Sequence, residues 1–418
     1  MENKRYITAI DLGSYKIRTV VAEVTSSSFH IVGVGQAASH GLKKGSIVDL
    51  DEVSFNLKSS VEEASRMTGW PIEHAFIGLS GAHLELIETR GVVAISREDR
   101  EIRHDDVERV IEAAKVIHLP EDRLIVDIIP RSFTVDALSG ITDPRGMLGV
   151  RLEMEGRLVT ASRAVLHNLL RVLDRSEINP LGMVMQVYAG GELLLTEDER
   201  KVGTVYIDMG GGTTTVALFQ NGDLKRHIVL PFGGGYVTQD IASGLGITLE
   251  HAEKLKLLYG VSRIQDASND LTFEYTPIGR ENSETITQRD LAYIIEPRMD
   301  EMLRLVRKTL EEERLLDLPG GVVWTGGGTA MPGFIPLAKE IVDSTSRVAY
   351  PDYIGVRDPS FSAAIGVIRH ALPFVSFDLD RQSEGRMKSL SARSKRSKDK
   401  PSDDTLFARV KRWFHEFI

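Results

Sequence analysis

The sequence contains no cysteine among its 418 residues. Disulfide scaffolds, thiolate metal sites and cysteine nucleophiles are therefore excluded. It also lacks an apolar signal core, because the opening residues MENKRYITAIDLG pass directly into a strand pattern. No window approaches the roughly 18 uninterrupted apolar residues that a membrane-spanning helix needs. We therefore expect a protein that is made and kept on the cytosolic side.

Positive charge is scarce over most of the chain. The formal net charge is −9, but the residues from Asp378 onward hold 11 Lys and Arg against 7 Asp and Glu. The preceding 377 residues therefore carry a net charge of −13. An acidic body is a poor nucleic-acid binder, since phosphate contacts need a basic face, and no nucleic-acid partner is expected. The basic tail is the part of the chain that could bind an anionic surface.

A strand–turn–strand pattern occurs twice, in a chain whose length already predicts two or more domains. The stretch YITAIDLGSYKIRTVVAEV returns as GTVYIDMGGGTTTVALFQNGDL, and aligning Asp11 with Asp208 gives an offset of 197 residues. A repeat at this distance predicts two related domains rather than a short-period solenoid. Residues 81–156 mix short strands with one helix, RHDDVERVIEAAKVI, and look like a separate insert. The regular pattern ends near Pro373.

Three glycine-rich turns, at 11–14, 208–213 and 326–333, each follow an apolar run that is typical of a strand. Glycine lets the backbone come close, so that successive N–H groups and a hydroxyl can cradle phosphate oxygens. An aspartate at the strand end can hold Mg2+ through water, whereas the third turn has no acid and better suits a base or ribose. Any one of these clusters alone is more often a tight turn, and none is a P-loop or a Rossmann fingerprint. Three in one order, two of them as aspartate hairpins, favour a nucleotide site.

Together these stretches resemble the actin-like ATPase superfamily, and within it they are most similar to the FtsA family of bacterial cell-division proteins. The residues that carry the resemblance are IDLGSYKIR, GTVYIDMGGGTTTVALFQNG and WTGGGTAMPGF. It runs from about Tyr6 to Pro373 and picks up again at the C-terminal helix. The resemblance implies an α/β, actin-like ATPase fold with two related domains around a nucleotide cleft and an inserted subdomain of the FtsA type.

The resemblance also divides the chain into subdomains and terminal segments. These are 1–80 and 161–192 (the two parts of the first actin-like subdomain), 81–160 (the inserted subdomain), 193–232 and 305–377 (the two parts of the second), 233–304 (nucleotide and partner binding), 378–402 (a linker) and 403–418 (an amphipathic helix). The linker consists mainly of Ser, Lys, Arg and Asp, which cannot build a core, so it is expected to be disordered.

The resemblance assigns cofactor-binding roles, with ATP and Mg2+ as the ligands. The residues concerned are Asp11, Gly13, Ser14, Lys16, Asp208, Gly210, Gly211, Gly212, Thr213, Gly234, Glu253, Lys256, Gly326, Gly327 and Gly328. Asp11 and Asp208 match the acids that face Mg2+ through water. Glu253 and Lys256 share one helix face and match the pair that holds ribose and base, with a solvent-exposed salt bridge as the alternative interpretation. Gln186 occupies the place of a water-orienting residue; an amide is a feeble base, so at most slow ATPase activity is expected.

The resemblance further implies a protein that polymerises, tethers FtsZ filaments to the cytoplasmic membrane and recruits later division proteins through the inserted subdomain. The FtsZ C-terminal peptide is expected to dock on the subdomain that ends near Arg304, where Arg298 and Glu301 lie one turn apart. An ordinary surface salt bridge is the alternative interpretation of that pair. The alternative functions are a pilus-assembly ATP-binding protein and a small-molecule kinase of the same fold.

The closing residues DDTLFARVKRWFHEFI place large apolar side chains on one stripe of a helical wheel. The stripe consists of Leu406, Phe407, Val410, Trp413, Phe414, Phe417 and Ile418. A helix that docks on its own protein would show the same stripe, but here a linker of some 25 residues and a basic run precede it. This context favours an interfacial membrane anchor. We therefore expect a peripheral protein that binds anionic lipids on the cytoplasmic face of the cell membrane, at the division septum.

Overall fold

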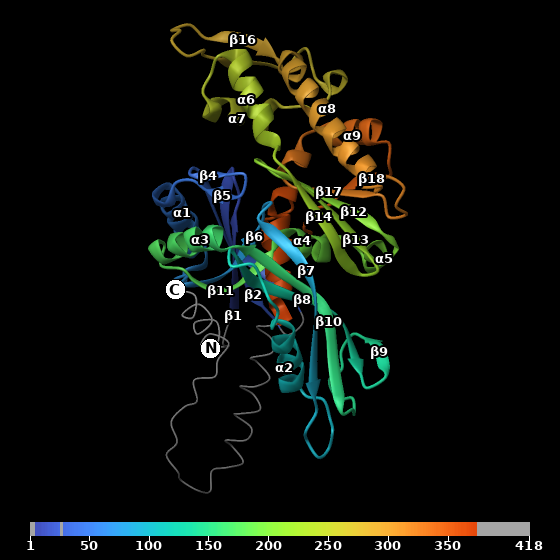
Figure 1. Ribbon diagram of the computed structural model, residues 1–418. Helices are drawn as coiled ribbons and strands as arrows, with labels where there is room; N and C mark the ends of the chain where they lie inside the picture. The colour runs from blue at the N-terminus through green and yellow to red at the C-terminus, as the bar shows by residue number, and fades with distance from the viewer. Residues whose placement is uncertain (1–4, 26–27, 374–418) are drawn as a thin grey trace.

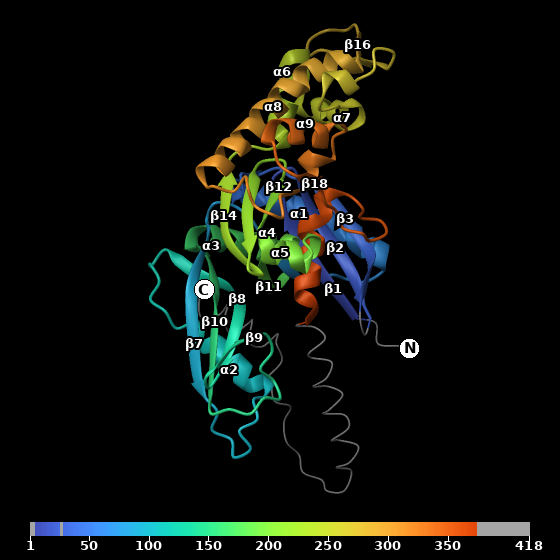
Figure 2. The same cartoon turned by 90° about the vertical axis from the view of Figure 1, so that its right-hand side faces the viewer.

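The computed structural model describes residues 5–25 and 28–373. The predicted linker and terminal helix lie outside these residues. The described part is elongated (Figures 1 and 2): two sheets lie side by side at its centre, a mainly helical region rises above one of them, and a further sheet extends below.

The first central sheet has the strand order β11-β6-β1-β2-β3. Its strands are β1 (Arg5–Leu12), β2 (Lys16–Val24), β3 (Phe29–Ala38), β6 (His74–Leu79) and β11 (Asn179–Met185). Helices α1 (Leu50–Thr68) and α3 (Arg163–Arg175) bury their apolar sides on one face, and the helical residues 362–373 pack on the other. The helix α1 begins after Asp49, whose carboxylate accepts from two free N–H groups, and ends at Gly69 with a φ of 68°.

The second central sheet has the order β14-β13-β12-β17-β18. Its strands are β12 (Thr204–Met209), β13 (Thr214–Gln220), β14 (Asp223–Leu230), β17 (Val322–Thr325) and β18 (Ser346–Val348). Both sheets combine a three-stranded antiparallel meander with two parallel strands, so β1, β2, β3, β6 and β11 correspond in order to β12, β13, β14, β17 and β18. The prediction of two related domains is confirmed by this shared topology.

The inserted region forms a four-stranded sheet of its own, covered on one face by a helix. Its elements are β7 (Leu84–Ala94), α2 (His104–Ala114), β8 (Arg123–Val135), β9 (Leu138–Ile141) and β10 (Arg151–Ser162). The prediction of short strands is wrong here, because β7, β8 and β10 have 11, 13 and 12 residues. The pairing of β10 with β8 shifts register twice, at Glu155/Gly156 and at Val159/Thr160. Such irregularities interrupt the alternation of side chains by which a sequence reveals a long strand.

The upper region follows the second hairpin and returns to the second sheet. Its elements are α6 (Gly234–Leu245), α7 (Leu249–Tyr259), β15 (Thr272–Tyr275), β16 (Glu284–Thr287), α8 (Gln288–Glu312) and α9 (Phe334–Val342). Their apolar sides share one core with the second sheet. The remaining described elements are β4 (Leu42–Lys43), β5 (Ser46–Ile47), α4 (Gln186–Leu194), α5 (Glu197–Val202) and the short 3-10 turns η1 (Ile264–Asp266), η2 (Gly327–Ala330) and η3 (Pro359–Phe361).

Candidate functional site

The two aspartate hairpins meet at the centre of the molecule. Ser14 follows β1, and Gly212 lies in the turn between β12 and β13. A Cβ built on Gly212 would lie 2.8 Å from the Cβ of Ser14, so the Ser14 side chain lies directly against the backbone of the second turn. Turns that are nearly 200 residues apart in the sequence therefore line one site, as the repeat predicts.

The turn after β12 is tied to the start of α6. The N–H of Gly210 donates to the carbonyl of Thr213 over 2.9 Å, which closes the turn. The N–H groups of Gly234 and Gly235 donate to the carbonyls of Gly210 and Gly211 over 2.9 and 2.8 Å. The second loop and the first turn of α6 therefore form one rigid backbone surface. Gly13 and Lys16 complete the first loop. Lys16 is the first residue of β2, and its side chain is exposed.

Asp11 and Asp208 occupy corresponding positions near the ends of β1 and β12. Asp11 accepts a hydrogen bond from Gln186 Nε2 over 2.8 Å and faces Arg18 Nη1 at 3.6 Å. Burial raises the pKa of Asp11 in spite of these two partners. Burial, and then the negative charge of Asp11, raise the pKa of Asp208 to about 7. The charge of Asp11 thus makes Asp208 harder to ionise, and a cation bound near both carboxylates would favour their charged forms.

The donors present here fit Mg2+ held partly by water. Carboxylate oxygens are the hard ligands that Mg2+ prefers, and this ion keeps several waters and phosphate oxygens in its shell. Among residues 5–25 and 28–373, no three acidic or histidine side chains gather closely enough to hold a metal ion. A site made of two aspartates therefore needs the remaining ligands from a bound nucleotide and from water.

The third glycine turn lies against the second. Gly326 has a φ of 88°, and a Cβ on it would overlap Asp208 Oδ1 and the carbonyl of Met209, so no other residue fits there. A Cβ on Gly234 would come within 3.8 Å of both Gly328 Cα and Lys256 Nζ. Gly326, Gly327 and Gly328 thus form a bare backbone surface beside the second loop. Such a surface allows a flat group to approach closely.

Glu253 and Lys256 point from α7 into this site. Lys256 Nζ lies 2.6 Å from Glu253 Oε2, 2.8 Å from Thr238 Oγ1 and 3.2 Å from the carbonyl oxygen of Gly234. Only 9% of the Lys256 side chain is exposed, and burial lowers the pKa of its ammonium. The interpretation as a solvent-exposed salt bridge is therefore wrong. The pair is fixed against the first turns of α6, where it can face a ligand.

Gln186 is the first residue of α4 and lies beside Asp11. Its side chain is buried against Gly78, where a Cβ would come within 2.6 Å of Gln186 Nε2. A cavity of about 20 Å³ is lined by Gln186, Asp208 and Thr215 among others, which is room for one water molecule. The amide can therefore orient water next to the aspartates, and this role for Gln186 stays a prediction.

Three residues at the site were not singled out from the sequence. Arg18 lies two strand positions after Lys16 and faces Asp11. Thr238 lies one helical turn after Gly234 and bonds to Lys256. Tyr15 stands between Ser14 and Lys16, and its ring is 5.7 Å from Lys256 Nζ. Each of the three could have been found by its short spacing from a residue already assigned. The residues that they contact, however, lie up to about 240 positions away in the sequence.

Arg298 and Glu301 lie on α8, away from the aspartates. They form an ion pair, but Arg298 also donates to Asp240 on α6, from Nε over 2.5 Å and from Nη2 over 3.1 Å. Its guanidinium lies 5.8 Å from the ring centre of Tyr236. The interpretation as an ordinary surface pair is therefore incomplete, because Arg298 is held across two helices. Its role toward a partner stays a prediction.

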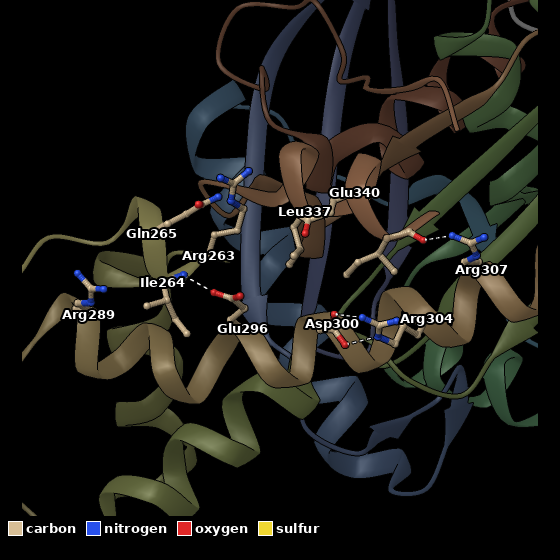
Figure 3. A pocket seen from close by; sticks show the side chains of 11 residues that line it. Arg263, Ile264, Gln265, Arg289, Glu296, Asp300, Arg304, Arg307, Leu337 and Glu340 are labelled. Atoms are coloured by element: carbon tan, nitrogen blue, oxygen red, sulfur yellow. Dashed lines mark hydrogen bonds and ion pairs between the residues drawn. The ribbon is translucent and has the colours of Figure 1, made fainter. Parts of the chain in front are cut away.

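A cavity of about 490 Å³ lies between α8, α9 and residues 263–265, away from the phosphate loops (Figure 3). Some of its charged groups pair within the chain. Arg304 bonds to Asp300, and Arg307 bonds to Glu311 and to the carbonyl of Ile341. The residues that line this cavity include neither the two aspartates nor the three glycine turns.

The predicted membrane-binding residues 406–418 lie outside the described part of the chain. Within that part, no helix combines the length and the apolar character that crossing a membrane requires.

Comparisons with known proteins agree with this geometry. The sequence model described as "Cell division protein FtsA" matches residues 205–366, and the model described as "SHS2 domain inserted in FTSA" matches residues 81–160. The chain is 45% identical over 371 residues to "Cell division protein FtsA" from Bacillus subtilis, covering 89% of this chain and 84% of the relative.

Two solved structures share the fold at low sequence identity. The structure titled "PilM-PilN type IV pilus biogenesis complex" matches with a TM-score of 0.59 at 16% identity, covering 88% of this chain and 98% of that one. Spiroplasma citri MreB 5 bound to AMPPNP matches with a TM-score of 0.54 at 13% identity, covering 90% and 99%. The actin-like fold with its insert, expected from the sequence, is confirmed.

Proposed function

The chain belongs to the FtsA family of cell division proteins, and from this premise we propose that it binds Mg2+ and ATP between its two halves, polymerises, and tethers FtsZ filaments to the cytoplasmic membrane at the division site. The observation that carries the nucleotide part is the contact between the two aspartate loops, with Asp11 and Asp208 facing the same space. Family membership favours cell division over the two alternatives, a pilus-assembly ATP-binding protein and a small-molecule kinase.

Each half contributes a different part of the nucleotide site. Gly13, Ser14 and Lys16 hold phosphate oxygens from the first half. The backbone N–H groups around Gly210–Thr213 hold them from the second, where the bare backbone permits close approach. Glu253 and Lys256 hold the ribose and base against the third turn, formed by Gly326, Gly327 and Gly328. Asp11 and Asp208 would hold Mg2+, which when bound would neutralise phosphate charge and favour the ionised form of both carboxylates.

Hydrolysis, where it occurs, is slow. Gln186 orients water beside Asp11 but cannot remove a proton efficiently, because an amide is not a useful base. Asp208, with a pKa raised to about 7 by burial and by the charge of Asp11, is reserved for the metal. The nucleotide then acts mainly as a ligand that holds the two halves together and supports polymerisation.

The membrane tether is the C-terminal stripe that begins at Leu406. Trp and Phe suit the boundary between headgroups and acyl chains, and each Lys or Arg near an anionic leaflet adds roughly 1 kcal/mol. One such helix binds reversibly, whereas several on one polymer bind by avidity. The described residues hold no membrane-spanning helix, which suits a peripheral attachment.

The FtsZ C-terminal peptide docks on the face formed by α6 and α8, around Arg298. The guanidinium is held in place by Asp240 and by Glu301, so a peptide carboxylate meets a positioned donor. Later division proteins are recruited through the inserted subdomain, whose sheet has one face that α2 does not cover.

A single flotation assay tests both ends of the tether. Full-length protein with Mg2+ and ATP is mixed with anionic vesicles and FtsZ, and both proteins should float together. Trp413→Glu should leave both proteins unfloated, because burying one large side chain is worth roughly 1.5–3 kcal/mol and the added charge costs more. Arg298→Glu should float alone and leave FtsZ behind.

Arg304→Glu is the matched control, since Arg304 is an exposed, ion-paired arginine of the same helix. It should float with FtsZ like the wild type. Flotation of Trp413→Glu at the wild-type level would refute the terminal anchor. Retention of FtsZ by Arg298→Glu would refute the proposed docking face and leave the anchor standing.

A further inference from the structure

Tyr15 is a side chain of the first half that is inserted into the second. It lies in the first loop, between Ser14 and the start of β2. A Cβ built on Gly211 would lie 2.5 Å from Tyr15 Cδ2, and one built on Gly235 would overlap the phenol oxygen. The ring therefore lies directly against two glycines, one in the second loop and one in the first turn of α6.

The phenol and ring also contact polar groups of the second half. The hydroxyl shares a hydrogen bond with Thr238, and Lys256 Nζ lies 5.7 Å from the ring centre. Burial, and then the charge of Glu253, raise the pKa of Tyr15, so the phenol stays protonated. We call the surface made by Gly211, Gly235, Thr238 and Lys256 the Tyr15 socket. Each of these four residues lies in the second half.

The socket is made of the same elements as the nucleotide site. Gly211 belongs to the second phosphate loop, and Lys256 belongs to the pair that faces ribose and base. Next to Tyr15, the loops meet through small groups, with Ser14 against Gly212. At this point of the cleft, Tyr15 is thus the large side chain that crosses from one half to the other. The halves cannot separate here unless the ring leaves its socket.

We propose that Tyr15 is a latch that gates nucleotide exchange: docked in its socket it holds the cleft closed, and a bound nucleotide leaves only after the ring has withdrawn. This inference rests on the proposed nucleotide site. The two glycines of the socket have a specific role in it, because a side chain at either would displace the ring. Tyr15 is a positioning residue, since it acts through closure of the cleft.

Stopped-flow fluorescence with N-methylanthraniloyl-ATP and Mg2+ tests the latch on the full-length chain. Tyr15→Ala should raise the dissociation rate at least tenfold, while the association rate changes less than threefold. Tyr15→Phe keeps the ring and loses only the hydroxyl, so its dissociation rate should stay within threefold of wild type. Tyr293→Ala removes a half-exposed tyrosine of α8 and serves as the control, with wild-type rates.

A second variant tests the socket from the other side. Gly235→Ala leaves Tyr15 intact but takes the space of its phenol, and should raise the dissociation rate as Tyr15→Ala does. Unchanged dissociation in Tyr15→Ala would overturn the latch while leaving nucleotide binding in place. Slower dissociation or tighter binding in Tyr15→Ala would also overturn it, because the ring would then block the site. A wild-type chain that binds no nucleotide analogue would overturn both the latch and the proposed function.

Discussion

The two halves of the molecule have sheets of the same strand order, but they differ at their matching aspartates. In the first half, Asp11 has two partners, the amide of Gln186 at 2.8 Å and the guanidinium of Arg18 at 3.6 Å. In the second half, burial and the charge of Asp11 raise the pKa of Asp208 to about 7. The first loop also carries a large side chain, Tyr15, whereas the second is nearly bare backbone.

This difference shows how one duplicated hairpin can serve two purposes. The first half supplies Asp11, which has Arg18 as a charged partner, and Tyr15, the side chain that crosses the cleft. The second half supplies a surface of glycine backbone and Asp208, whose carboxyl group would ionise more readily beside a bound cation. An acid whose pKa is raised by burial and by a neighbouring carboxylate is costly to ionise in the ligand-free protein, and a bound Mg2+ would relieve that cost. The proposed nucleotide site is therefore asymmetric although the fold around it is repeated.

The largest effect is expected from Asp208→Ala. Loss of a carboxylate that faces Mg2+ should weaken binding of Mg2+ and ATP at least tenfold, a factor that corresponds to about 1.4 kcal/mol. Isothermal titration calorimetry measures this directly. The Tm of the ligand-free variant should equal or exceed that of wild type, because the substitution removes an acid whose pKa is raised to about 7. Wild-type affinity in this variant would show that the second half does not hold the metal.

A second effect, on stability rather than on binding, is expected from Asp127, a partly buried acid on β8 of the inserted sheet. Burial raises the pKa of Asp127 to about 6, although His370 Nε2 lies 3.7 Å from it. A raised acid pKa means that its stabilisation is present at low pH and is lost as the pH rises from about 4 through 6. The raised pKa of His370, which bonds to Glu192, acts in the same direction.

Asp127→Asn should therefore raise the Tm at pH 7.5, and should raise it by roughly a third as much at pH 4.5, which still lies above the ordinary pKa of 3.8. The shift from 3.8 to about 6 sets an upper limit of about 3 kcal/mol, and an increase of a few degrees is expected. Thermal unfolding at both pH values checks this, with Asp198→Asn as an exposed control. A lower Tm at pH 7.5 would show that the ion pair with His370 outweighs the cost of burial.

The hairpins, the glycine turns and the helices could be predicted because their signals are local. Asp11 and Asp208 repeat within matching strand patterns, and the spacing of Glu253 and Lys256 places them on one helix face. The burial of that pair could not be predicted, since it depends on Thr238 from another helix. The same holds for Arg298, whose partner Asp240 is 58 residues away, and for Tyr15, which meets glycines of the other half. Partners across a cleft leave no periodicity in the sequence.

A double-mutant cycle tests whether the two unlike halves close on one Mg2+ and ATP. The affinity for Mg2+ and ATP is measured by calorimetry for wild type, Asp11→Asn, Asp208→Asn and the double variant. If both carboxylates face one cation, each chain should bind one nucleotide, and the combined loss should differ at least threefold from the product of the single losses. Independent, multiplying losses, or wild-type affinity in either single variant, would contradict it.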